Sequence, residues 1–174
     1  MTPFRLFTLM CVLGHAFFNA SSSKKYAYPA WSPATLAGLI ILLAFNLRAL
    51  QDDIVLVASL GSSAFLVFSL PTRVTASLKN CVFGHAWGLL AGVICFQGHQ
   101  WLGSGQTLFY AAAVTLAFLG MVGTDTDHAP AAGTALAVAM NNISWQSTLW
   151  MLAMATLIAG AKTPLRALIR DLRD

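Results

Sequence analysis

The sequence predicts an all-α, polytopic membrane protein with about six transmembrane segments. Of its 174 residues, 57% are hydrophobic and 9% are charged, whereas a soluble domain typically has about 25% charged residues. The mean hydropathy is +0.71, and every acidic residue is Asp, so the Glu/Lys helix faces of soluble proteins cannot form. These observations exclude an ordinary soluble domain and make the lipid bilayer its surroundings.

The chain divides into three regions: an amino-terminal interfacial helix with a linker (1–30), a transmembrane domain (31–161) and a basic tail (162–174). Arg5, His15 and Asn19 interrupt the apolar stretch of residues 3–20. We therefore expect this stretch to lie at the membrane surface, with a further span as the alternative. A cleavable signal fits poorly, because the neighbouring lysines follow the apolar core.

Polar or helix-breaking residues separate the apolar segments of the transmembrane domain, which are 31–50, 54–70, 80–97, 107–123, 130–140 and 147–161. A helix needs about 20 residues to cross the hydrocarbon core. Residues 31–50 meet this length. Residues 130–140 are too short to cross alone, so they are predicted to form a half-helix.

The basic residues predict the orientation. With six segments, Lys24, Lys25, Arg73, Lys79 and the basic tail lie on one side of the membrane, and Arg48 lies on the other. Cytoplasmic loops are enriched in Lys and Arg, so both ends of the transmembrane domain are expected in the cytoplasm, in a bacterial inner membrane. The basic residues form no continuous stripe, and we therefore predict no nucleic-acid partner.

A weak internal repeat divides the segments into two sets of three. Aligning Gly61 with Gly133 also places Ser62 over Thr134. An odd number of segments per half would make this a 3+3 inverted repeat, the arrangement of many secondary transporters. A chance alignment of two small-residue helices is the alternative.

Small residues interrupt two apolar segments, at Gly61-Ser62-Ser63 and at Gly133-Thr134. If both are starts of half-helices, their free N–H groups could bind an anion without a lysine. The alternative is that small residues only allow neighbouring helices to approach closely.

The acidic cluster before residues 130–140 contains Asp125, Asp127 and His128 and is followed by Pro130. Pro suits the first turn of a helix, where its missing N–H is no loss. Ionisable groups near the membrane can bind cations or transfer protons. For the two aspartates we prefer a solvated turn, whereas His128, beside the predicted helix start, is the better functional candidate.

The segment 80–97 contains a glycine stripe, in which Gly84, Gly88 and Gly92 recur every four residues. Such a stripe predicts close packing against a neighbouring helix or a second copy of the chain. Asn80 and His85 flank the stripe, and an interhelical hydrogen bond is the alternative to a functional role for His85.

No sequence feature indicates enzymatic chemistry. There is no nucleophile elbow, phosphate loop, H-E-x-x-H motif or metal-spaced Cys/His set, and Cys11, Cys81 and Cys95 lie singly in apolar stretches. We therefore predict no enzyme activity, no cofactor and no metal. A membrane enzyme with Asp125, Asp127 and His128 in one polar pocket is ranked well below a transporter.

Three short motifs resemble the HPP family of integral membrane proteins: Leu60-Gly61-Ser62-Ser63-Ala64 with Pro71 downstream, Asn80-x-x-x-Gly84-His85, and His128-Ala129-Pro130-Ala131-Ala132-Gly133-Thr134-Ala135. The resemblance covers roughly residues 31–161. It implies nitrite transport, to which family members of chloroplasts and cyanobacteria are linked. Ala129 stands where the family has its first proline, and aspartates precede it, which would repel nitrite.

These observations predict a small transporter or channel for a small inorganic anion, with nitrite as the specific substrate and a homo-oligomer as the assembly. The predicted substrate-binding residues are Gly61, Ser62, Ser63, Asn80, His85, His128, Pro130, Gly133 and Thr134. The alternative is a non-transporting subunit that packs beside foreign membrane subunits through the glycine stripe and the basic tail.

Overall fold

The computed structural model describes residues 31–46, 54–103, 105–141, 143–165 and 169. Together they form six α-helices and one short 3₁₀ helix, with no strand among the described residues: α2 (Trp31–Asn46), α3 (Ile54–Ser69), η2 (Val74–Ala76), α4 (Leu78–Leu102), α5 (Gln106–Gly123), α6 (Ala131–Met140) and α7 (Trp145–Ala161). The predicted all-α class is confirmed. The expected interfacial helix in residues 1–30 and most of the basic tail lie outside the described residues.

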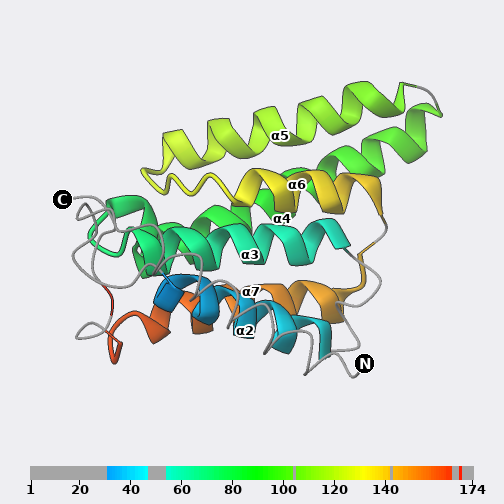
Figure 1. The fold of residues 1–174 in the computed structure, drawn as a ribbon. Helices are drawn as coiled ribbons and strands as arrows, with labels where there is room; N and C mark the ends of the chain where they lie inside the picture. The colour runs from blue at the N-terminus through cyan, green and yellow to red at the C-terminus, as the bar shows by residue number, and fades with distance from the viewer. Residues whose placement is uncertain (1–30, 47–53, 104, 142, 166–168, 170–174) are drawn as a thin grey trace.

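The helices pack side by side, with α4 at the centre of the arrangement (Figure 1). α4 contacts α5, α6 and α7, while α3 contacts α2, α6 and α7. α5 and α2 lie on opposite sides of the bundle (Figure 1). This leaves α6 packed against both α3 and α4, and polar residues of the three helices are buried together.

Local sequence signals fix the ends of two helices. Ser77 precedes α4, and its hydroxyl accepts a hydrogen bond from the backbone N–H of Asn80. Ser144 caps α7 in the same way by accepting from Ser147. Gly103 ends α4 with a positive φ of 65°, a conformation that glycine adopts without steric cost.

The glycine stripe lies in the contact between α4 and α6. A Cβ added at Gly84 would stand 2.6 Å from the Cβ of His128, one at Gly88 would stand 2.5 Å from the carbonyl oxygen of Ala131, and one at Gly92 would stand 2.5 Å from the Cβ of Val138. The sequence left two packing partners open, a neighbouring helix or a second copy of the chain. The structure shows that the partner is α6 of the same chain, together with the loop before it.

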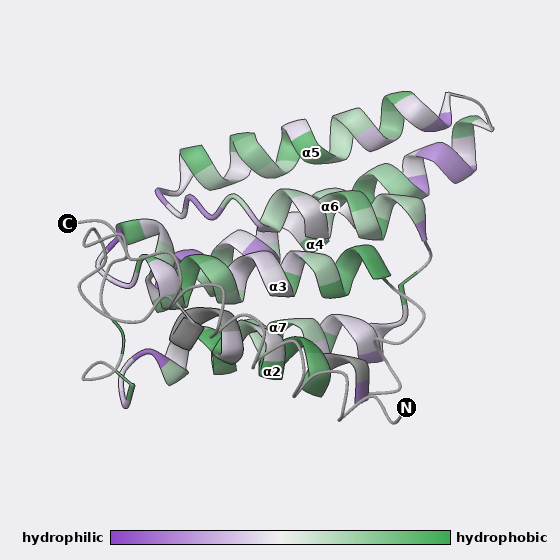
Figure 2. Cartoon of the chain, in the orientation of Figure 1, coloured by the Kyte–Doolittle hydropathy of each residue, from purple (hydrophilic) through white to green (hydrophobic). Residues whose placement is uncertain are grey.

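Among the described helices, two are long and apolar enough to cross a membrane, α4 with 25 residues and α5 with 18. Their outward faces carry exposed hydrophobic side chains such as Leu90 and Ile94 of α4 and Leu119 of α5. Figure 2 shows hydrophobic residues along the helices and hydrophilic ones in the connection between α5 and α6 and where α4 ends. Such a surface suits a lipid environment.

The predicted helix start at Gly61-Ser62-Ser63 is wrong, because α3 runs without interruption from Ile54 to Ser69. Oγ of Ser62 lies 3.1 Å from the carbonyl oxygen of Ala58, and Oγ of Ser63 lies 3.0 Å from that of Ser59, each one turn earlier. Each hydroxyl therefore has an acceptor within its own helix, as serine can without breaking a helix.

The second predicted half-helix is short, as expected, but its first amides are already bonded. α6 has 10 residues. The N–H groups of Ala131, Ala132 and Gly133 donate to the carbonyls of His128, Ala129 and Pro130 at 2.9, 3.1 and 3.0 Å. These donors are not free to hold an anion in the described arrangement, so any ligand site nearby has to use side chains.

Candidate functional site

A buried polar centre joins α3, α4, α6 and the loop before α6. We define the polar centre as Ser59 and Ser63 of α3, His85 of α4, His128 of the loop and Thr134 of α6. Their side chains range from 0% to 4% exposed. Groups this polar are costly to bury unless they are hydrogen-bonded, and each of them is.

Ser63 is the junction of the polar centre. Its Oγ lies 2.8 Å from Nε2 of His85 and 3.0 Å from Nε2 of His128. The two imidazole rings meet edge to face, with centroids 5.0 Å apart. The hydroxyl of Ser63 therefore bridges the Nε2 atoms of His85 and His128.

The outer nitrogens of both histidines also have partners. Nδ1 of His85 lies 2.8 Å from Oγ1 of Thr134, which lies 2.9 Å from Oγ of Ser59. Nδ1 of His128 lies 2.9 Å from the carbonyl oxygen of Thr75, beside α4 in η2. The contacts form one continuous chain from α3 through α6 and α4 to the connection between α3 and α4.

Local sequence positions these side chains. Ser59 and Ser63 are one helical turn apart, so they share a face of α3. Gly84 precedes His85 and leaves room for His128, as its absent Cβ would touch that of His128. Gly133 precedes Thr134 and packs on Ser59, whose Cβ lies 3.1 Å from where a glycine Cβ would stand. The motif glycines thus make space for the polar centre.

His128 lies in the loop, outside the membrane-spanning helices. Burial lowers the pKa of its imidazole below the ordinary value, and the hydrogen bond to the Thr75 carbonyl opposes this shift. Burial disfavours the charged form, whereas an acceptor carbonyl favours it. His128 therefore resists protonation in the described arrangement.

Two residues at the start of α4 hold the loop in place. Nδ2 of Asn80 donates to the carbonyl of Asp127 at 3.1 Å, and Nζ of Lys79 donates to the carbonyl of Asp125 at 3.1 Å. Both aspartate side chains are exposed, and Asp125 has a positive φ of 52°. They form a turn outside the polar centre, in agreement with the interpretation as a solvated turn.

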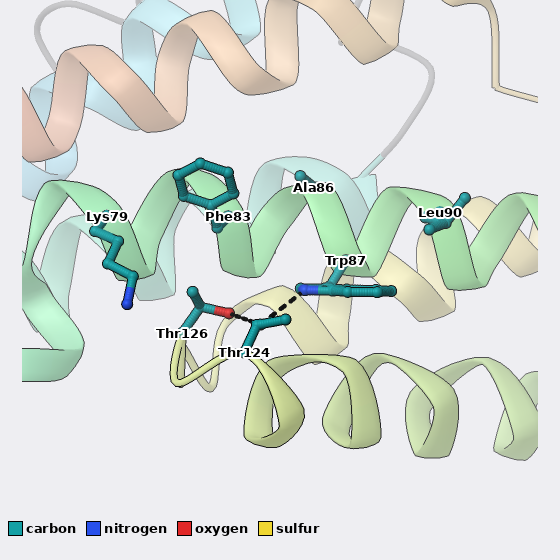
Figure 3. Close-up of a pocket in the computed structure, with 7 residues that line it drawn as sticks. All are labelled: Lys79, Phe83, Ala86, Trp87, Leu90, Thr124 and Thr126. Atoms are coloured by element: carbon teal, nitrogen blue, oxygen red, sulfur yellow. Dashed lines mark hydrogen bonds between the residues drawn. The ribbon is translucent and has the colours of Figure 1, made fainter.

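A cavity of about 370 Å³ lies between α4 and the start of the loop before α6 (Figure 3). Trp87 closes one side, with Nε1 donating to Oγ1 of Thr124 at 3.0 Å, and Oγ1 of Thr124 lies 2.8 Å from that of Thr126. Lys79 and Phe83 line it further along α4. None of its lining residues belongs to the polar centre.

The structure gathers part of the predicted binding set. Ser63, His85, His128 and Thr134 come together in the polar centre. Three more predicted residues lie around it. Asn80 donates to the Asp127 carbonyl in the loop, the Pro130 carbonyl accepts from the N–H of Gly133 before α6, and Gly133 packs on Ser59. Gly61 and Ser62 lie apart: Gly61 packs against Ile41 of α2, and Ser62 is exposed.

The sequence analysis missed Ser59, Thr75 and Cys81. Helical spacing could have found two of them, because Ser59 lies four residues before Ser63 and Cys81 four before His85. Sγ of Cys81 and a nitrogen of each histidine lie within 4.8 Å of one another, a grouping of metal-ligand type. Both nitrogens of each imidazole already have hydrogen-bond partners, so the described arrangement is a hydrogen-bonded centre.

Comparisons with known proteins point to one family. The model for the transmembrane region of HPP proteins matches residues 9–169. A transmembrane protein of Dictyostelium discoideum is 29% identical over 113 residues, which are 64% of this chain and 36% of that protein. A second Dictyostelium discoideum transmembrane protein is 27% identical over 109 residues, covering 62% and 38%. The chain thus matches little more than a third of the length of these relatives. No solved structure matches.

Proposed function

Because the chain belongs to the HPP family of transmembrane proteins, we propose that it carries a small inorganic anion across the membrane, with the polar centre on the transport path. Nitrite is the first substrate to test. The family assignment makes the chain an integral membrane protein, and the names of its relatives agree.

One observation carries the proposal: two histidines bridged by one hydroxyl are buried where membrane helices meet. His85 lies on α4, which is long and apolar enough to span a membrane, and both rings are at most 1% exposed. Ionisable groups inside membrane proteins are rare and usually mark a substrate or proton pathway. A purely structural role, holding two helices together, would need only a single hydrogen bond, so the second buried histidine favours a functional role.

The polar centre has the right chemistry for an anion. A protonated imidazole supplies a positive charge and N–H donors, and the hydroxyls of Ser63 and Thr134 supply further donors. Asp125 and Asp127, which the sequence predicted would repel nitrite, have exposed side chains in the loop. They lie outside the hydrogen-bonded centre, where water screens their charges.

The proposed topology has six membrane segments related by a 3+3 inverted repeat, with the basic tail in the cytoplasm of a bacterial plasma membrane. The distribution of side chains along α4 supports this orientation. Lys79 lies in its first turn, and the exposed Trp101 lies in its last. Positive charges favour the cytoplasmic side, and exposed tryptophans favour the interface. A homo-oligomer remains the expected assembly.

The alternative, a non-transporting subunit, loses its main support. It required Gly84, Gly88 and Gly92 to form a docking face for foreign subunits. All three pack against α6 or the loop before it in the same chain. That face is occupied, which favours the transporter.

Uptake into proteoliposomes tests the proposal. Purified protein is reconstituted, and nitrite uptake is compared with that of empty vesicles and with nitrate, formate and chloride. We expect uptake above empty vesicles and a large loss in His85→Gln and His128→Gln, which retain polar groups but cannot be charged. His99→Gln is the matched control, because His99 lies on α4 beside Phe109 rather than in the polar centre.

Two results would overturn the proposal. If the wild type moves none of the four anions faster than empty vesicles, small-anion transport is wrong. If both polar-centre variants transport as well as His99→Gln, the placement of the path is wrong. Gel filtration of every variant separates loss of transport from loss of folding.

A further inference from the structure

We propose that the polar centre binds one exchangeable proton and passes it between His85 and His128 through the hydroxyl of Ser63. The inference deepens the proposed function by naming the coupled ion, but it rests on hydrogen-bond geometry and can be tested without any transported anion.

The hydrogen-bond partners of His128 determine which of its nitrogens carries a hydrogen. The carbonyl oxygen of Thr75 only accepts hydrogen bonds, so Nδ1 of His128 must carry a hydrogen. In the neutral ring, Nε2 is then an acceptor. Nε2 therefore takes the single hydroxyl proton of Ser63, 3.0 Å away, and the Ser59 carbonyl, which also lies 3.0 Å from Oγ of Ser63, does not receive it in this state.

The proton of Ser63 in turn determines which nitrogen of His85 carries a hydrogen. Because Ser63 has used its proton, Nε2 of His85 must donate to Ser63. Nδ1 of His85 then accepts from Thr134, which accepts in turn from Ser59. With both histidines neutral, every polar atom of these contacts is satisfied, and all hydrogen bonds point toward Thr75.

When the polar centre binds one more proton, the hydrogen bonds that join His85, Thr134 and Ser59 reverse their direction. If Nδ1 of His85 carries a hydrogen, it donates to Thr134, and Thr134 donates to Ser59. The hydroxyl of Ser59 then donates to the carbonyl of Leu56, which lies 2.8 Å away. An acceptor for the reversed chain is therefore already in place.

In this loaded state the extra proton has two positions of equal bonding. When His128 holds it, Nε2–H of His128 donates to Ser63, and Ser63 donates to Nε2 of His85. Transfer moves the proton from His128 to Ser63 Oγ while the Ser63 proton moves to His85. The Nε2–H bond of His128 breaks as an O–H bond forms on Ser63, the former O–H bond of Ser63 breaks as an Nε2–H bond forms on His85, and charge is conserved.

Few other titratable groups face the pair. On α4, Cys81 lies beside the histidines, with Sγ 3.6 Å from the carbonyl of Ala155, and Lys79 points to the carbonyl of Asp125. In the loop, Asp125 and Asp127 are exposed. The polar-centre residues on α3 and α6 are hydroxyls, Arg73 before η2 is exposed, and α7 faces Cys81 with a backbone carbonyl.

The polar centre is buried and has no fixed counter-charge, and this couples the binding of the proton to the binding of an anion. The loaded polar centre is positive, and nothing charged among the described residues is bonded to it. An entering anion would stabilise the loaded state, because opposite charges attract strongly where water is excluded. Proton and anion would therefore bind together.

Nitrogen-15 NMR of histidine-labelled protein in lipid nanodiscs tests the inference. At high pH we expect His128 to carry its hydrogen on Nδ1 and His85 on Nε2. As the pH falls below the ordinary imidazole pKa of about 6.5, the two rings should titrate as one coupled pair taking up a single proton. In Ser63→Ala the rings should titrate separately, whereas Ser62→Ala, on the exposed face one residue away, should behave as wild type.

The wild-type spectrum alone can overturn the inference, even if Ser63→Ala fails to fold. The opposite tautomers, or independent titration of the two rings, would contradict it. Proton flux measured with a pH dye in the uptake assay separates the two proposals. Anion uptake with no proton movement would defeat the relay and leave transport standing, and a coupled titration without uptake would do the reverse.

Discussion

Gly84 lies directly against His128, so that a Cβ at Gly84 would stand 2.6 Å from the Cβ of His128 and 3.3 Å from the carbonyl oxygen of Thr126. This contact brings the loop before α6 onto α4 and sets the separation of the two histidines. A residue that the sequence indicates only as a packing position thus determines the geometry of the polar centre.

Gly84→Ala is expected to push His128 away from Ser63 and to destabilise the protein by about 1–3 kcal/mol, the usual cost of inserting a methyl group into a filled contact. Thermal unfolding in detergent measures the loss of stability, and nitrite uptake measures the loss of function. Gly160→Ala is the control, because a Cβ there has open space. Equal behaviour of the two variants would contradict the role of Gly84.

Gly92→Ala should separate packing from the polar centre. Its Cβ would stand 2.5 Å from the Cβ of Val138 and 2.8 Å from the carbonyl oxygen of Ala135. We expect a loss of stability of about 1–3 kcal/mol while His128 keeps its bond to Thr75. Thermal unfolding checks the first expectation and the nitrogen-15 shift of His128 Nδ1 the second; an unchanged unfolding temperature would show that α4 and α6 can move apart freely.

Acid should destabilise the protein through His128. Burial lowers its folded-state pKa, so below the ordinary value of about 6.5 the unfolded chain binds a proton that the folded one resists. Its contribution to stability is complete above that pH and is lost as the pH falls toward the folded-state pKa. Unfolding curves at pH 7.5 and pH 5 should therefore differ more for wild type than for His128→Gln. A larger acid effect in the variant would show the opposite shift.

Asn80→Ala should loosen the loop that carries His128. The variant loses the bond from Nδ2 to the Asp127 carbonyl, which contributes about 1 kcal/mol in a typical case. Hydrogen exchange measured by mass spectrometry should become faster in residues 124–130. Gln97→Ala, at an exposed position on the same helix, is the control and is expected to leave exchange in residues 124–130 unchanged. Faster exchange in both variants would show that loss of the Asn80 hydrogen bond is not the cause.

Periodicity and composition predicted the helices well. The described helices fall within a few residues of the segments expected from the sequence, because apolar runs in a membrane protein have few other ways to satisfy their backbone. The glycine stripe also predicted close packing, although the sequence could not select between α6 and a second copy. That choice depends on the path of the chain between α5 and α6.

The polar centre was only half predictable. His85, His128, Ser63 and Thr134 stood out as polar residues in apolar or signature stretches. The break at Gly61 was wrong because serine hydroxyls bond to their own helix, so small polar residues need not end it. Ser59 was missed for the same reason: one more hydroxyl in an apolar helix is unremarkable until its partner Thr134, 75 residues away, is known.

Among the described residues, none of the members of the polar centre carries a permanent charge. A site of this kind gains its positive charge only with the proton it binds, so a proton and a monovalent anion held there together have no net charge. The electrical potential across the membrane performs no work on such a neutral pair. Transport through the polar centre would then follow the pH gradient and the anion gradient, and changing the membrane voltage would leave its rate unaltered.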